Sequence, residues 1–156
     1  MIDAHIRFAI ADLYADYAAA LDQRRYDDWL ALYAENSSYI VQPRENYDAG
    51  LPLATIRLES KAMLKDRIHG ITETLYHAPY YQRHIIGGPR IHAGNDCWDV
   101  EANYIVIRTH NDQPSEILSA GRYIDRLVRE DEAIRFASKL CVFDTELVPN
   151  SLIYPV

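Results

Sequence analysis

The spacing of apolar residues changes character near the middle of this chain of 156 residues. In the first half it follows the three-and-four interval of an amphipathic helix, as from Ile6 through Ile10 to Leu13. In the second half apolar and polar residues alternate as in a strand with one buried face, as from Trp98 to Val100. Helices first and long strands afterwards predict an α+β layout, with the helices packed on the apolar face of a sheet.

These periodic segments divide one expected domain, residues 1–156. We expect helices at about 5–22, 26–34 and 60–76, strands at about 37–43, 82–92, 97–109, 115–129 and 133–145, and an apolar tail at 146–156. The breaks between the later strands are short and polar, as in hairpins, so the sheet is expected to be long and antiparallel. Gly87, Gly88 and Gly121 lie within strand pattern, where bulges or bends would curve it. In the last strand, alternation puts Phe136 on the apolar face and Lys139 on the other.

Charge and composition exclude several classes of function. Sixteen basic and 23 acidic side chains give a net charge of −7, which repels phosphate backbones and anionic lipids, so nucleic acid and membrane are poor partners. The sequence has no basic region ahead of an apolar run and no apolar stretch long enough for a bilayer. Two cysteines are too few for a disulfide framework. A cytoplasmic protein with reduced thiols is the expectation.

No familiar catalytic or metal motif occurs in the sequence. There is no glycine-rich phosphate loop, no G-x-S-x-G elbow and no H-E-x-x-H helix. His69 follows Asp66 at the spacing of an iron-binding helix, but Thr74 stands where the second histidine is needed. Neither cysteine has a histidine two residues later, so the half-site of an iron–sulfur cluster is also missing. We expect no metal and no cofactor on this chain.

His84 is the candidate catalytic residue, because helices on a curved sheet can leave a cavity between the layers. The side chains that could complete a polar pocket with it are Tyr14, Asp16, Tyr17, Tyr104 and Asp125. No spacing fixes any of them beside His84, so we expect a hydrogen-bonded core histidine and no catalytic residue on this chain. The alternative is an acid–base site made of His84, Asp16 and Tyr14.

Three segments carry a resemblance to a known family. They are Arg57–Ile68 (RLESKAMLKDRI), Tyr80–Ile91 (YYQRHIIGGPRI) and Val142–Val156 (VFDTELVPNSLIYPV). With the order of elements over the whole chain, they resemble the small (beta) subunits of aromatic-ring-hydroxylating oxygenases. Among these subunits the chain is most similar to those of salicylate 5-hydroxylase-type enzymes, with terephthalate and anthranilate oxygenases as neighbours.

The resemblance implies a nuclear transport factor 2-like cone and a catalytic large (alpha) subunit as partner. That partner would carry a Rieske [2Fe–2S] cluster and a mononuclear iron and receive NAD(P)H-derived electrons from a ferredoxin and a reductase. The complex would hydroxylate an aromatic acid similar to salicylate with dioxygen. Three large and three small subunits commonly assemble in this family, with the small subunits associating as a trimer. The chain itself would be structural.

Two features keep other interpretations open. The tail could anchor on a neighbouring subunit or fold back over its own sheet edge. The stretch His84–Gly88 also resembles scytalone dehydratase-like proteins, but their second histidine is missing here, and only His110 lies just past a strand end. A stand-alone dehydratase or isomerase using His84 is therefore the alternative function, and a non-catalytic small-molecule binding module is another.

Tyrosine is the dominant aromatic residue, with 12 Tyr against 3 Phe and 2 Trp. A buried tyrosine must find a hydrogen-bond partner for its hydroxyl, whereas a tyrosine at the edge of a contact surface keeps its hydroxyl in contact with water. We expect Tyr14, Tyr17 and Tyr104 inside the cone. Tyr80, Tyr81 and Tyr154, in loop or tail, are expected at contact surfaces.

Overall fold

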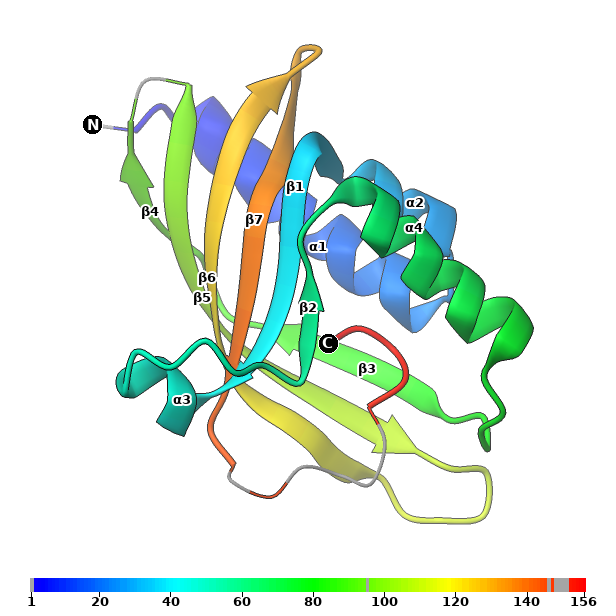
Figure 1. Ribbon diagram of the computed structural model, residues 1–156. Coiled ribbons are helices and arrows are strands. Elements are labelled where there is room, and N and C mark those ends of the chain that lie inside the picture. Colours follow the sequence, from blue (N-terminus) through cyan, green and yellow to red (C-terminus); the bar gives the residue numbers. More distant parts are fainter. Residues whose placement is uncertain (1, 95, 146, 148–151) are drawn as a thin grey trace.

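The computed structural model describes residues 2–94, 96–145, 147 and 152–156 as a curved sheet whose helices, other than the short one at Arg44–Asp48, lie on its concave side (Figure 1). The helices are α1 (Ala4–Asp22), α2 (Tyr26–Ala31), the short α3 (Arg44–Asp48) and α4 (Lys61–His69), which continues into a π-helical turn, η1 (Gly70–Thr74). The strands are β1 (Tyr33–Pro43), β2 (Ile56–Leu58), β3 (Tyr81–Ile86), β4 (Arg90–Ala93), β5 (Cys97–Thr109), β6 (Glu116–Glu130) and β7 (Ala133–Phe143). The expected α+β cone is confirmed.

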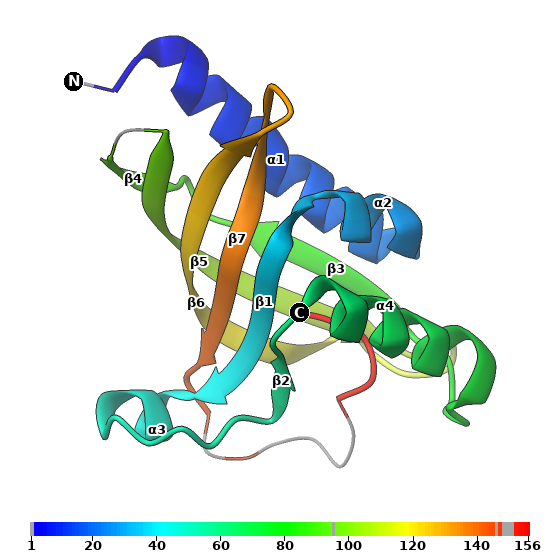
Figure 2. The ribbon, with the colours of Figure 1, turned by 45° about the horizontal axis from the view of Figure 1, so that its top comes forward.

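The helices begin where the sequence supplies capping side chains. Asp3 accepts a hydrogen bond from the backbone of His5 at the start of α1, and Ser60 accepts one from Met63 at the start of α4. Helix α1 buries the apolar stripe that the spacing predicts and crosses the concave face of the sheet, while α2 and α4 lie beside one another at one end of it (Figure 2). The helices thereby close one side of the cone.

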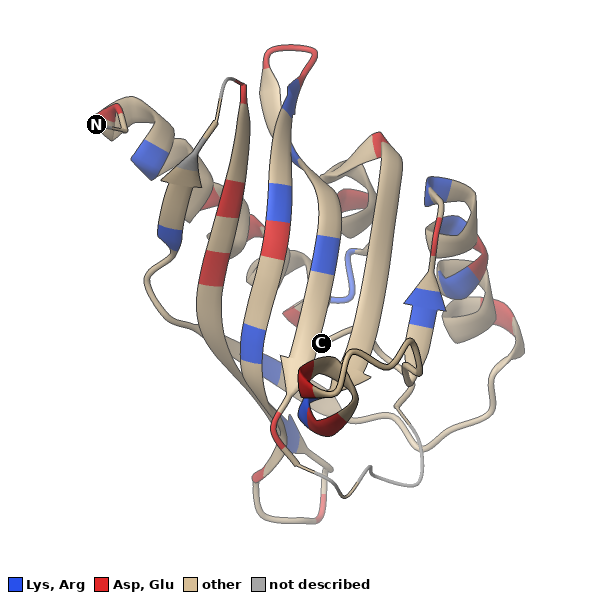
Figure 3. Cartoon of the chain, turned by 60° about the vertical axis from the view of Figure 1, so that its left-hand side comes forward, with Lys and Arg blue, Asp and Glu red and all other residues tan. Residues whose placement is uncertain are grey.

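The sheet is mixed rather than antiparallel. Its strand order is β2-β1-β7-β6-β5-β3, and β4 also pairs with β5. The hairpins β5–β6 and β6–β7 are antiparallel as expected, but β1 runs parallel to β7. Strand β1 enters the sheet from α2, and no hairpin joins it to β7, so the hairpin argument does not set its direction. Charges of both signs are spread over the strands and helices (Figure 3).

Several element boundaries differ from the predicted ones. The expected helix 26–34 ends at Ala31, and β1 begins at Tyr33 rather than at 37. The expected helix 60–76 is α-helical only to His69 before the π-helical turn. The expected strand 82–92 is two strands separated by 87–89, where Pro89 cannot donate to a ladder. Both halves still pair with β5.

A β-bulge in β7 places Lys139 inside the cone, against expectation. Leu127 of β6 pairs with Phe136, but the next pair is Arg126 with Ser138, so one residue of β7 is extra. The bulge shifts the alternation, and Phe136 and Lys139 both face the interior, with exposed fractions of 0% and 1%. The core is also rich in tyrosine. The buried members are Tyr14, Tyr17, Tyr26, Tyr33, Tyr39, Tyr80, Tyr104, Tyr123 and Tyr154, two of which, Tyr80 and Tyr154, were expected at contact surfaces.

Candidate functional site

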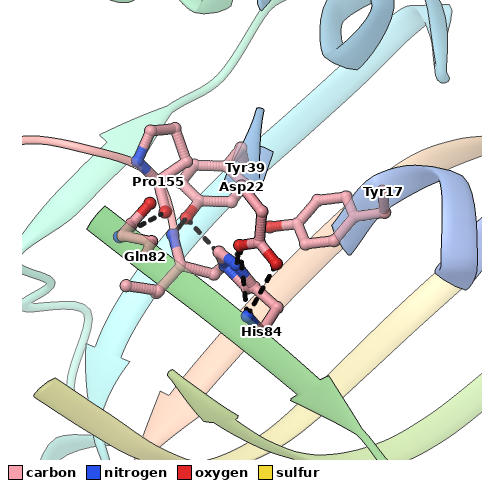
Figure 4. A network of polar contacts seen from close by, with 7 residues as sticks. Tyr17, Asp22, Tyr39, Gln82, His84 and Pro155 are labelled. Carbon is pink, nitrogen blue, oxygen red and sulfur yellow. Dashed lines mark hydrogen bonds and ion pairs between the residues drawn. The ribbon is translucent and has the colours of Figure 1, made fainter. Parts of the chain in front are cut away.

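A histidine and an aspartate meet inside the cone where β3 passes the end of α1. The Nδ1 atom of His84 lies 2.6 Å from Oδ1 of Asp22, the last residue of α1. The backbone N–H of His84 also donates to both carboxylate oxygens, at 3.0 and 3.1 Å (Figure 4). The ring nitrogen Nδ1 and the backbone N–H of His84 thus both face the Asp22 carboxylate. Asp22 therefore orients the histidine and ties the strand to the helix.

The alternative acid–base set of His84, Asp16 and Tyr14 is not brought together. Asp16 is exposed, because it lies two residues from the buried Tyr14 and so on a different face of α1. Tyr14 is buried, but its hydroxyl donates to Asp125 rather than reaching His84. Among the expected pocket residues only Tyr17 contacts His84, through an edge-to-face ring arrangement with centroids 6.0 Å apart. The carboxylate partner is Asp22, which sequence reasoning missed.

A second polar cluster lies deeper in the cone, where β6 and β7 face α1. Asp125 and Lys139 form an ion pair of 2.8 Å, and both side chains are fully buried. The Lys139 ammonium lies 3.5 Å from the ring centre of Tyr123 and 4.3 Å from that of Tyr17. Burial raises the pKa of Asp125, while the Lys139 ammonium and the Tyr14 hydroxyl oppose the rise.

The final described residues of the chain enter the mouth of the cone. Val156 is fully buried, and its carbonyl accepts hydrogen bonds from the hydroxyls of Tyr17 and, at 3.2 Å, Tyr39. Its N–H donates to the same Tyr39 oxygen at 2.9 Å. Gln82 of β3 donates to the carbonyl of Pro155 at 3.3 Å, beside His84 (Figure 4). The chain thus closes the interior with its own backbone.

Side chains of α4 and the following loop hold the same segment from outside. One guanidinium nitrogen of Arg67 donates to the carbonyls of Leu152 and Ile153, each at 2.8 Å. His77 Nε2 lies 2.6 Å from the Tyr154 hydroxyl. Residues 152–156 therefore fold back into their own cone, which differs from one of the two sequence alternatives, a tail folded over its own sheet edge. Residues 146 and 148–151 of the predicted tail lie outside the described residues.

The three segments that carry the family resemblance meet at this mouth. Arg67 comes from the first segment, Gln82 from the second, and the carbonyls that both bind come from the third. Tyr80, also of the second segment, packs its ring against Tyr154 at a centroid distance of 4.7 Å. Stretches far apart in the sequence are thus joined by side chain to backbone contacts around residues 152–156.

The arrangement limits the chemistry available inside the cone. A histidine held by a carboxylate is a typical general acid–base pair. The His84 side chain has no exposed surface, however, and within the described residues Nε2 has no hydrogen-bond partner. Cys141 contacts the Val156 carbonyl at 3.6 Å, and burial raises the pKa of its thiol to about 12. The His84 imidazole is therefore not accessible to a substrate in this conformation.

Two further searches concern only the described ranges. Over residues 2–94, 96–145, 147 and 152–156, no three His, Cys, Asp or Glu side chains gather closely enough to hold a metal ion. In the same ranges no helix is long and apolar enough to cross a bilayer.

Comparison with known proteins gives consistent results. The model of the SnoaL-like domain family matches residues 3–139. The chain is 31% identical to the anthranilate 1,2-dioxygenase small subunit of Burkholderia cepacia, over 96% of this chain and 93% of that one. It is 28% identical to the small oxygenase component of the p-cumate 2,3-dioxygenase system of Pseudomonas putida, over 90% and 80%.

A solved structure agrees with these relatives. It is the beta subunit of a candidate aromatic-ring-hydroxylating dioxygenase from Novosphingobium aromaticivorans, with 34% sequence identity. The two folds superimpose with a TM-score of 0.88 over 97% of each chain.

Proposed function

The chain belongs to the SnoaL-like domain family and is a small subunit of the aromatic-ring-hydroxylating dioxygenase type, and we propose that it assembles and holds catalytic large subunits. The observation that carries this is the 31% identity to the anthranilate 1,2-dioxygenase small subunit over 96% of the chain. The closed cone supports it. Its interior is filled with buried side chains and residues 152–156, as suits a rigid part of an oxidoreductase complex.

The proposed substrate of the complex is an aromatic acid similar to salicylate. Anthranilate and p-cumate, named for the two relatives, are both carboxylates on an aromatic ring, which supports this class. Salicylate itself rests on the sequence resemblance alone. Turnover of salicylate, anthranilate and benzoate by the purified complex would rank these compounds, and a complex that oxidises none of them would contradict the choice of class.

The proposal places the redox centres on the partner. The large subunit would carry the Rieske [2Fe–2S] cluster and the mononuclear iron and would receive NAD(P)H-derived electrons through a ferredoxin and a reductase. Three small subunits associated as a trimer would hold three large subunits in an α3β3 hexamer. The expected location is the cytoplasm, since the NAD(P)H that feeds such a system is there.

Co-expression with the proposed catalytic large subunit tests the assembly. Size-exclusion chromatography with light scattering should show one complex containing both chains, and the large subunit expressed alone should be aggregated or less active. Each chain expressed alone is the control. A small chain that stays monomeric and indifferent to the large subunit would rule the proposal out.

One observation favours a second candidate, a stand-alone dehydratase or isomerase: the 2.6 Å contact between His84 and Asp22. This function requires the mouth to open, because the imidazole is sealed in the described conformation. The isolated chain should then turn over a hydroxylated ring substrate, and His84→Ala should abolish that activity while Arg83→Ala, an exposed neighbour, should not. An inactive isolated chain would remove this candidate.

A further inference from the structure

A surface cleft of about 610 Å³ lies outside the closed interior and is lined by the π-helical turn η1, the loop that follows it and Tyr154 of the C-terminal segment. Its walls include Arg24, Leu75, Tyr76 and Pro79, and Tyr154 belongs to both the cleft and the mouth contacts. The volume lies in the range of small-molecule sites. This cleft is not part of the Asp22–His84 pair or of the buried ion pair.

Arg24 is held in the cleft in an unusual backbone conformation. Its φ angle is 56°, in the left-handed region that residues other than glycine rarely adopt. One guanidinium nitrogen donates to the Tyr80 carbonyl at 2.8 Å, and the group lies 5.5 Å from the ring centre of Tyr154 and 6.0 Å from that of Tyr81. The aromatic rings and the carbonyl fix the cation and leave further N–H donors for another group.

Arg24 also differs from most arginines of this acidic chain. Eight others lie within 4.0 Å of a carboxylate, whereas Arg24 has no such partner among the described residues. A second feature of the same wall is the π-helical turn η1, a rare element that occurs frequently at functional sites. An oriented cation without a carboxylate partner and a π-helical wall thus share one cleft.

The other walls determine which anion fits. Leu75 and Tyr76 are exposed to 41% and 105%, so the cleft has an uncovered apolar rim in the described chain. Glu73 lies on the wall as well, so it repels a ligand with two negative charges more strongly than a ligand with one. The site therefore suits a flat apolar body with a single acidic group at the Arg24 end, since a guanidinium binds a carboxylate with two parallel hydrogen bonds.

We propose that this cleft binds an aromatic monocarboxylate, with the carboxylate on Arg24 and the ring against Leu75 and Pro79. The inference rests on the cleft alone and stands whether or not the chain assembles with a large subunit. It also supplies a binding site for the alternative function, a non-catalytic small-molecule binding module.

Isothermal titration of the full chain with benzoate tests the proposal, with benzamide as the uncharged probe and phthalate as the dianion. Benzoate should bind one site per chain, and benzamide and phthalate should each bind at least about tenfold more weakly. Arg24→Gln should weaken benzoate binding by a similar factor. Arg90→Gln, an exposed arginine of β4, is the matched control and should leave the affinity within about twofold.

A second variant keeps the test decisive if Arg24→Gln disturbs the backbone at Tyr80. Leu75→Glu leaves Arg24 in place and adds a carboxylate to the wall, so it should also abolish benzoate binding while the circular dichroism spectrum stays unchanged. Absence of saturable benzoate binding to the natural chain overturns the proposal. So does equal affinity for benzamide, or benzoate binding that survives both Arg24→Gln and Leu75→Glu.

Discussion

The ammonium group of Lys139 has no exposed surface, which makes its immediate partners decisive for the fold. A charge away from water is tolerated only when it is paired and hydrogen-bonded. Asp125 supplies the opposite charge, and the ring faces of Tyr123 and Tyr17 supply further electrostatic attraction. The buried pair joins β6 to β7 in the centre of the cone and fixes how the aromatic rings of α1 pack on it.

Removing only the negative partner should therefore be costly. Asp125→Asn keeps the shape but leaves Lys139 buried without its countercharge, and we expect a loss of about 3–5 kcal/mol in the free energy of unfolding. The double variant Asp125→Asn with Lys139→Met removes both charges and should be more stable than Asp125→Asn alone. Urea unfolding measures both values. Losses that simply add in the double variant would show that the two side chains do not act as a pair.

The site shows where single residues can be predicted from the sequence and where they cannot. His84 was predicted to be a hydrogen-bonded core histidine, and it is buried with a carboxylate at 2.6 Å. Its partner was not predictable, because Asp22 lies 62 positions away and no periodicity relates a helix end to a strand across the cone. The exposure of Asp16 was predictable, because a residue two positions after the buried Tyr14 lies on a different face of the helix.

At the scale of elements, strands β6 and β7 come unusually close at Gly121. A Cβ atom built on Gly121 would lie 1.9 Å from the carbonyl oxygen of Val142 and 2.9 Å from Cα of Phe143. Gly121 pairs with Phe143 at the end of the ladder. Backbone atoms cannot move aside as a flexible side chain would, so only glycine fits at this bend of the sheet.

Gly121→Ala should consequently separate the ends of β6 and β7. We expect a loss of about 3 kcal/mol or more in the free energy of unfolding, since the added methyl overlaps backbone. Gly88→Ala is the matched control, because nothing lies within 4 Å of a Cβ at that position. It should change stability by no more than about 0.5 kcal/mol. Thermal unfolding followed by circular dichroism compares the two, and equal melting temperatures would refute the close-approach argument.

Periodicity indicated the longer helices and strands but not the short helix α3, and it indicated the pairing of the strands only in part. The segments β5, β6 and β7 are linked by short polar turns, and their antiparallel pairing was predicted correctly. The parallel pairing of β1 with β7 and the bulge after Phe136 were not predicted. Both depend on which strands become neighbours in the folded sheet, and the local alternation of apolar and polar residues does not specify this.

On the scale of the whole molecule, residues 152–156 act as the closing piece of the cone. They have little secondary structure of their own and are held by side chains of α1, β1, β3 and α4. Arg67 contributes two of these contacts from a half-buried position, where desolvation lowers the pKa of its guanidinium. We infer that the mouth contacts stabilise the segment locally more than they stabilise the whole domain.

Arg67→Met should therefore release the segment without unfolding the domain. We expect amide hydrogen exchange at 152–156 to accelerate by about tenfold or more, and global stability to fall by only about 1–2 kcal/mol. Lys65→Met, an exposed change on the same helix, is the control and should leave the exchange rate unaltered. Uniformly faster exchange across the sheet would mean instead that the segment and the cone unfold together.

The surplus of tyrosine makes the whole cone sensitive to alkaline pH in a defined direction. Burial raises the pKa of Tyr17, Tyr33, Tyr39 and Tyr123 well above the ordinary value, so these phenols stay protonated in the folded chain. In the unfolded chain they ionise near pH 10, and a raised folded pKa contributes stability that is complete below that pH and is lost as pH rises above it.

The phenolate absorbance of the buried tyrosines should thus appear together with the loss of circular dichroism, in one cooperative alkaline transition. Tyr123→Phe removes a buried hydroxyl that has no hydrogen-bond partner among the described residues, so it should move the midpoint to higher pH. Tyr76→Phe, at a fully exposed position, should leave the midpoint in place. Phenolate absorbance that develops gradually while the circular dichroism persists would show that water reaches the rings, and that the cone is open rather than closed.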